Sequence, residues 1–97
     1  MVKLTLPSSL FDMLPEDERL RRGLPRSVLL NPGSWEKLTR EIQERFPLLA
    51  KRVLTESATI AAGFVLVVNG EVMQSGYKSL DFHSGDEIFI IAAIAGG

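Results

Sequence analysis

The residues best suited to chemistry are the last ones of the chain, where an apolar, strand-like run narrows to small side chains and reaches Gly96 and Gly97. Glycine has no Cβ, so the backbone of another protein can approach it closely. A chain end of this kind can carry the α-carboxylate of Gly97 into a narrow foreign active site. Any reaction would then take place on the main chain, with Gly96 beside the reacting group. A Gly-Gly end is also a chemically inert way to finish a domain, so both interpretations stay open.

Other candidate chemistry is weaker. His83 is the only histidine and has no set of partner residues around it in sequence, which favours a turn residue over a catalytic base or metal ligand. The spacing of Asp81, Asp86 and Glu87 does not match a calcium loop, and we interpret these residues as part of a turn and a strand edge. The chain has no cysteine, which excludes a thiolate metal site and a cysteine nucleophile. It also has no phosphate-binding glycine loop. We predict that the chain itself binds no cofactor and no metal.

Composition limits the classes of fold and partner that remain. Ninety-seven residues with 45% hydrophobic content suit a single compact domain. Eleven basic residues balance twelve acidic ones, so we predict neither a nucleic-acid partner nor a membrane partner. The one basic cluster, at Arg19, Arg21 and Arg22, adjoins acidic residues and is typical of a solvated surface. The start does not resemble a signal peptide, and no apolar run approaches ~18 residues. We expect a cytoplasmic protein.

The first half of the chain predicts two strands. Residues 2–6 alternate between apolar and polar side chains, which is typical of a half-buried strand, and Pro7 ends it. Residues 8–24 predict irregular structure with one helical turn. A short apolar run at 26–31 lies between Pro25 and an Asn-Pro-Gly turn. This run predicts a second strand paired back on the first.

A helix follows, with Ser34 as its N-cap. The apolar residues recur at steps of three, four, four and three, which is one face of an α-helix. These residues are Trp35, Leu38, Ile42, Phe46 and Leu49. Pro47 should end or kink the helix just after Phe46. We interpret Trp35 as a core anchor rather than a ligand platform, because it belongs to the apolar face.

The second half predicts three strands. Residues 64–68 form an uninterrupted β-branched and aromatic run, which predicts an interior strand covered on both faces. Asn69-Gly70 joins it to a short strand at 71–73 in a tight hairpin, because both central turn residues need positive φ. A crossing segment at 77–82 leads to the last strand at 87–92, which is apolar enough for the middle of a sheet.

These elements together predict an α+β fold. A single main helix must cover one face of a mixed sheet of four to five strands. The first and last strands would lie side by side and parallel, joined by the crossover that contains the helix. This is the β-grasp arrangement found in ubiquitin-like proteins. We expect residues 1–92 to form one domain and residues 93–97 to form a flexible tail that ends in Gly-Gly.

The chain resembles the ubiquitin-like sulfur carrier proteins over essentially its whole length. The likeness lies in the layout and in three short motifs, Val68-Asn69-Gly70-Glu71, Ser84-Gly85-Asp86-Glu87-Ile88 and the closing Ala95-Gly96-Gly97. Within this family it is most similar to the small subunit of molybdopterin synthase and related thiocarboxylate carriers. Many of those subunits carry two prolines where this chain has Ala92-Ala93, so the pathway stays open.

The resemblance implies a defined cycle. A ubiquitin-activating-type adenylating enzyme would use ATP and magnesium to turn the Gly97 carboxylate into an acyl-adenylate, and a sulfur donor would convert this into a thiocarboxylate. An acceptor synthase or large subunit would then receive the sulfur. Gly96 and Gly97 would thread the partner's site, and Ala93, Ile94 and Ala95 would line the docking arm. The chain would be a protein cosubstrate or small synthase subunit rather than a self-sufficient enzyme.

Two alternatives remain. A ubiquitin-like modifier joined through Gly97 to lysine side chains would share the same activated intermediate. A non-catalytic β-grasp interaction module would carry the terminal glycines incidentally. In each case an apolar patch on the outer face of the sheet, near the last strand, would mark the docking surface. The sequence does not specify its residues.

Overall fold

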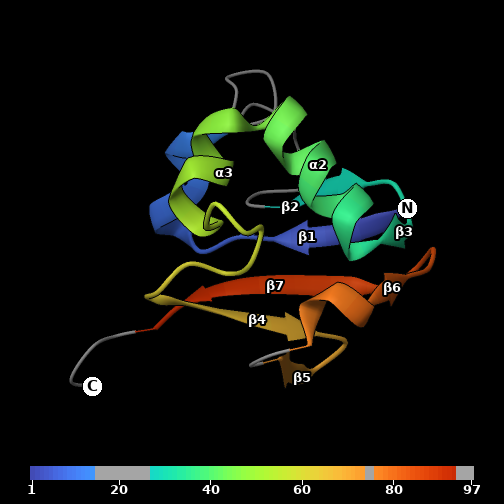
Figure 1. Ribbon diagram of the computed structural model, residues 1–97. Coiled ribbons are helices and arrows are strands. Elements are labelled where there is room, and N and C mark those ends of the chain that lie inside the picture. The colour runs from blue at the N-terminus through green and yellow to red at the C-terminus, as the bar shows by residue number, and fades with distance from the viewer. Residues whose placement is uncertain (15–26, 74–75, 94–97) are drawn as a thin grey trace.

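The computed structural model describes residues 1–14, 27–73 and 76–93 (Figure 1). The predicted basic cluster and residues 94–97 of the predicted tail lie outside these residues. The elements in chain order are β1 (Val2–Thr5), η1 (Ser8–Met13), β2 (Ser27–Leu30), β3 (Gly33–Ser34), α2 (Trp35–Arg45), α3 (Pro47–Val53), β4 (Phe64–Val68), β5 (Glu71–Met73), η2 (Tyr77–Ser79), β6 (Asp81–Phe82) and β7 (Glu87–Ala92). The predicted strands are confirmed, and η1 is the helical turn expected after Pro7.

The main sheet has the strand order β2-β1-β7-β4-β5. β1 pairs parallel to β7 and antiparallel to β2, while β4 pairs antiparallel to both β7 and β5. The expected parallel contact between the first and last strands is therefore confirmed, and β7 occupies the centre of the sheet (Figure 1). β3 and β6 form a separate two-stranded sheet. The chain has the predicted α+β β-grasp fold.

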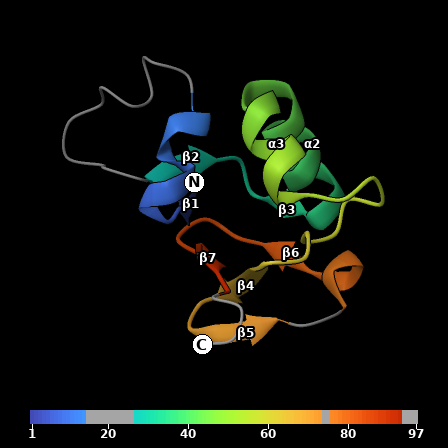
Figure 2. The ribbon, with the colours of Figure 1, turned by 90° about the vertical axis from the view of Figure 1, so that its left-hand side faces the viewer.

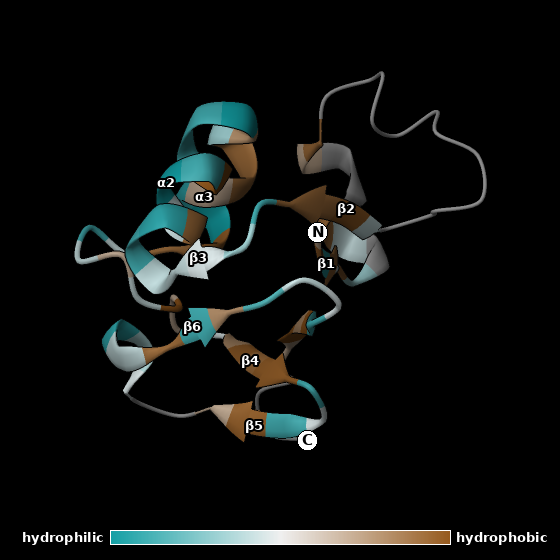
Figure 3. Cartoon of the chain, turned by 90° about the vertical axis from the view of Figure 1, so that its right-hand side faces the viewer, coloured by the Kyte–Doolittle hydropathy of each residue, from teal (hydrophilic) through white to brown (hydrophobic). Residues whose placement is uncertain are grey.

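The helices begin and end where the local sequence predicts. The Ser34 side chain accepts a hydrogen bond of 3.2 Å from the backbone N–H of Lys37, which caps α2. α2 ends before Phe46, and Pro47 opens α3, where its missing N–H costs no helical hydrogen bond. Trp35 is buried as expected, and its Nε1–H donates to the carbonyl oxygen of Ala58 at 2.7 Å. The outward side of α2 is hydrophilic (Figure 3).

The helices α2 and α3 lie together on one side of the sheet (Figure 2). On that side Leu4, Leu66 and Ile88 enter the hydrophobic core. The prediction that residues 64–68 are covered on both faces is wrong. Only Leu66 of this strand is fully buried, whereas Val65 and Val67 are half-buried on the face that carries no helix. An uninterrupted apolar run here reflects a core on one side and an apolar surface on the other.

The Asn69-Gly70 turn has the predicted positive φ values of 49° and 86°. Its Asn69 side chain also joins β4 to the start of β7. The Asn69 amide Nδ2–H donates to Asp86 Oδ1 at 3.1 Å, and Asn69 Oδ1 accepts from the Glu87 backbone N–H at 2.9 Å. The other Asp86 oxygen accepts from the His83 backbone N–H at 2.8 Å. The His83 bond first, and then the Asn69 bond, hold the pKa of Asp86 below its ordinary value of 3.8.

This lowered pKa predicts a loss of stability in acid. The folded carboxylate resists protonation, so the unfolded chain binds a proton first as the pH falls below 3.8. The stabilising contribution of Asp86 should therefore be present near neutral pH and disappear as the pH falls through the folded-state pKa. Urea denaturation between about pH 2 and pH 7 would measure it. An Asp86→Asn variant should be less stable at pH 7 and should lose this component of the pH dependence. Parallel pH profiles for the two proteins would contradict the prediction.

Candidate functional site

The part of the predicted site that the structure describes lies at the end of β7 (Figure 1). Ala93 is the last described residue, and Ile94, Ala95, Gly96 and Gly97 lie outside the described part. The Ala93 backbone N–H donates to the carbonyl oxygen of Gly63 at 2.8 Å. The preceding Ala92 stands opposite Phe64 in the sheet register. The base of the predicted tail is therefore held against β4 by main-chain hydrogen bonding.

The uncovered face of the sheet carries a group of apolar side chains that we call the open-face patch. Its members alternate with buried neighbours and stand opposite one another across strands, as Val67 does with both Phe89 and Val72. The patch consists of Val65, Val67, Val72, Phe89 and Ile91. Exposure reaches 57% at Val72, 47% at Ile91 and 36% at Phe89. Side chains of this kind exposed together are typical of a protein-binding surface.

The open-face patch has a polar border along β1. Lys3 stands opposite Glu87, and Thr5 stands opposite Phe89. The apolar surface thus covers β4, β5 and the part of β7 from Phe89 to Ile91, which leads to Ala93. Residues 88–92 are all apolar and show no period-two pattern in the sequence, so only the paired strands decide which alternate set faces outward.

A groove of about 490 Å³ lies beside the end of β7, on the face of the sheet that carries the helices. We call it the tail-base groove. Its main lining residues are Leu10 and Met13 from η1, Arg52 from α3, Phe64 from β4, and Ala92 and Ala93 at the end of β7. The Arg52 guanidinium lies 5.9 Å from the centroid of the Phe64 ring, within the range of a cation–π contact. No local sequence pattern distinguishes Arg52, because its neighbours come from four separate segments.

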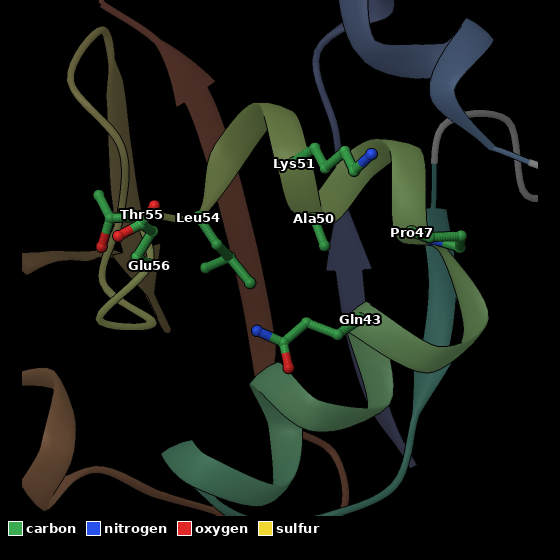
Figure 4. Close-up of a pocket in the computed structure, with 7 residues that line it drawn as sticks. All are labelled: Gln43, Pro47, Ala50, Lys51, Leu54, Thr55 and Glu56. Atoms are coloured by element: carbon green, nitrogen blue, oxygen red, sulfur yellow. The ribbon is translucent and has the colours of Figure 1, made fainter.

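A second groove, of about 390 Å³, lies between α2, α3 and the segment that follows α3. We call it the helix-face groove. Gln43 comes from α2, Ala50 and Lys51 come from α3, and Leu54 follows α3 (Figure 4). Its lining includes none of the residues predicted to do chemistry.

His83 lies at the other end of β7, remote from Ala93 along the strand. Its Nδ1 is 3.9 Å from Asp86 Oδ2, within the turn that precedes the strand. Among the side chains that the structure describes, no three from histidine, aspartate or glutamate are arranged to hold a metal ion. No helix in the described part of the chain is long and apolar enough to span a membrane.

The sequence matches no known family model and no curated protein, but the structure resembles several solved ones. A chain of the Amycolatopsis orientalis BexX/CysO complex is 22% identical, with a TM-score of 0.72 over 100% of both chains. Mycobacterium tuberculosis CysO, described as an antigen, is 18% identical, with a TM-score of 0.73 over 97% of this chain and 100% of that one. SAMP1 from Haloferax volcanii is 16% identical, with a TM-score of 0.65 over 99% and 98%. At these identities the likeness establishes a shared ubiquitin-like β-grasp fold.

The facing of β7 can be tested with two adjacent substitutions. Ile91→Lys adds a charge to the open-face patch, so we expect the free energy of unfolding to change by no more than about 1 kcal/mol. Ile90, only 3% exposed, points into the core, and Ile90→Lys should prevent folding because it buries an unpaired charge. Urea denaturation would measure both variants. Binding of a hydrophobic dye should decrease in I91K. Equal stability of the two variants would contradict the assigned facing.

Proposed function

We propose that this chain is a sulfur carrier whose C-terminal Gly97 is adenylated by a partner enzyme and then converted to a thiocarboxylate. One observation carries the proposal. The central strand β7 exposes Phe89 and Ile91 on the uncovered face and continues directly into Ala93, where the predicted tail begins. A docking surface and the base of the reactive segment therefore belong to one rigidly paired element.

The proposed chemistry explains why a partner is needed. A carboxylate is a poor electrophile, so it first attacks the α-phosphorus of ATP, and pyrophosphate leaves. Hydrosulfide from the sulfur donor then attacks the carbonyl carbon of the acyl-adenylate, AMP leaves, and loss of the S–H proton gives the thiocarboxylate. That sulfur is a nucleophile and can be passed to an acceptor. ATP and magnesium belong to the partner, and this chain supplies the main-chain end at Gly97, with Gly96 beside it.

Three kinds of partner follow from this cycle in the cytoplasm. They are a ubiquitin-activating-type adenylating enzyme, a sulfur donor and an acceptor synthase or large subunit. We propose that the adenylating enzyme docks on the open-face patch while Ala93, Ile94 and Ala95 lead the glycines into its site. The matched Amycolatopsis structure is a complex of CysO with BexX, which supports a heteromeric partner for this chain. The resemblance to the molybdopterin synthase small subunit makes a pterin precursor the first acceptor to test.

A second candidate function shares the first chemical step. One matched structure is the small archaeal modifier protein 1 of H. volcanii, and its name supports conjugation to other proteins. In that function the acyl group of Gly97 would be transferred to a lysine side chain instead of receiving sulfur. The adenylate is common to both routes, so the fate of the activated end distinguishes them.

The end group itself provides the decisive test. We expect protein from its native host to react with a thiol-selective alkylating reagent, with the adduct located on the C-terminal peptide by mass spectrometry. The chain has no cysteine, so a thiocarboxylate is the group that would react. Intact mass is insufficient, because replacing oxygen by sulfur adds nearly the same mass as oxidation of one of the three methionines.

Deleting Gly97 is the matched control, and it should abolish the adduct while leaving the unfolding temperature unchanged. An unmodified end in the presence of the adenylating enzyme, ATP and sulfur donor would refute the carrier function. High-mass conjugates that require Gly97 would favour the modifier instead. Full cellular function of a chain without Gly97 would exclude both the carrier and the modifier, and the non-catalytic interaction module would be the remaining function.

The docking surface predicts a separate effect. Ile91→Lys should lower kcat/KM for this chain in ATP–pyrophosphate exchange by about tenfold or more, because a lysine would be desolvated in an apolar interface. The assay uses the ubiquitin-activating-type enzymes of the source organism. Arg40→Glu, on the exposed side of α2, is the control and should have little effect. Equal activity of I91K and the wild type would exclude the open-face patch as the docking surface.

A further inference from the structure

We infer that Arg52 is a docking residue that binds a carboxylate at the rim of the channel through which the adenylating enzyme takes in residues 94–97. This inference rests on the proposed function and adds a second contact to it. The open-face patch lies on one side of the sheet at the end of β7, and the tail-base groove with Arg52 lies on the other side.

The position of Arg52 follows from the strand register. Phe64 stands opposite Ala92, and the next residue, Ala93, is hydrogen-bonded to Gly63. The Arg52 guanidinium lies over the Phe64 ring, so it stands beside the last residues of β7. An enzyme that encloses residues 94–97 in a channel must bring the rim of that channel against this surface. Any rim side chain on the helix side of the sheet therefore meets the tail-base groove.

The chemistry of the groove selects a carboxylate. Arg52 has the only ionisable side chain among the described residues that line it. No carboxylate among the side chains that the structure describes forms an ion pair with Arg52. A guanidinium at 5.9 Å from the centroid of an aromatic ring keeps its N–H groups available for bidentate hydrogen bonds to a planar anion. The occupant is thus an aspartate or glutamate of the partner.

The surroundings of Arg52 make such a pair effective. Leu10 is buried, and Met13 and Phe64 are half-buried, so the groove offers an apolar wall beside the cation. A pair closed against this wall is less screened by solvent than one on an open helix surface. Through this ion pair and the open-face patch, the partner would contact the end of β7 on both faces of the sheet. Contacts on both faces would fix the direction in which the tail enters the channel.

The neighbouring residue Lys51 provides a matched control. Lys51 and Arg52 are both exposed and both lie in the last turn of α3, but Lys51 lines the helix-face groove instead (Figure 4). Arg52→Glu and Lys51→Glu therefore change the net charge and the end of the helix in the same way. The measurement is the KM for this chain in ATP–pyrophosphate exchange with the adenylating enzyme, at low and high salt.

We expect R52E to raise KM by about tenfold or more with kcat unchanged, and K51E to change KM by less than about twofold. R52K, which keeps the charge but not the bidentate geometry, should lie between the wild type and R52E. The difference between R52E and wild type should shrink at high salt. Equal KM values for R52E and K51E would overturn the inference while leaving adenylation of the wild type intact. Absence of exchange with the wild type would instead refute the proposed function, and the inference with it.

Other occupants of the groove give different results. Binding of the enzyme to a chain that ends at Ala93 can be measured by calorimetry, and the ratio between the wild-type and R52E affinities should persist there. Loss of that ratio would mean that the groove holds the chain's own residues 94–97. A dimer in sedimentation experiments that R52E disrupts would mean that it holds a second copy. Either result would overturn the inference.

Discussion

Strand β7 hydrogen-bonds to β1 on one side and to β4 on the other, and the rest of the structure depends on this central position. Parallel pairing of the first and last strands requires a crossover, and α2 and α3 fill it on one side of the sheet. Because side chains alternate along a strand, Ile88 and Ile90 complete the core while Phe89 and Ile91 remain on the uncovered face. One strand thus contributes to the core, to the open surface and to the base of the predicted tail.

The two ends of β7 are held in different ways. At its start, Asn69 and Asp86 form side-chain hydrogen bonds that tie the β4–β5 hairpin to the strand. At its end, the hydrogen bond from Ala93 to Gly63 joins two main-chain groups, beside Arg52 and Phe64 of the tail-base groove. The start of the strand is thus fixed by side chains, whereas the end that leads to the predicted tail is fixed by a main-chain hydrogen bond.

The open-face patch and the tail-base groove contribute two different kinds of interaction energy. The patch offers apolar area, which contributes to affinity in rough proportion to the area removed from water. The groove offers the charge of Arg52, which contributes mainly to orientation and to the choice of partner. Both surfaces adjoin the same end of β7. We therefore expect recognition to depend on the folded domain as much as on the terminal glycines.

The sequence by itself determined the local features, because each depends on residues a few positions apart. They include the Ser34 cap, the break at Pro47 and the positive φ values at Asn69 and Gly70. The order of the β-grasp elements could also be predicted, from the apolar patterns of the strands and the helix. Gly96 and Gly97 remain predicted site residues. Only the tertiary structure decided which alternate side chains face outward, since an all-apolar strand reads the same whichever face is covered. It also brought Arg52 to the Phe64 ring, because the packing of α3 on the sheet, and no local pattern, joins residues from separate elements.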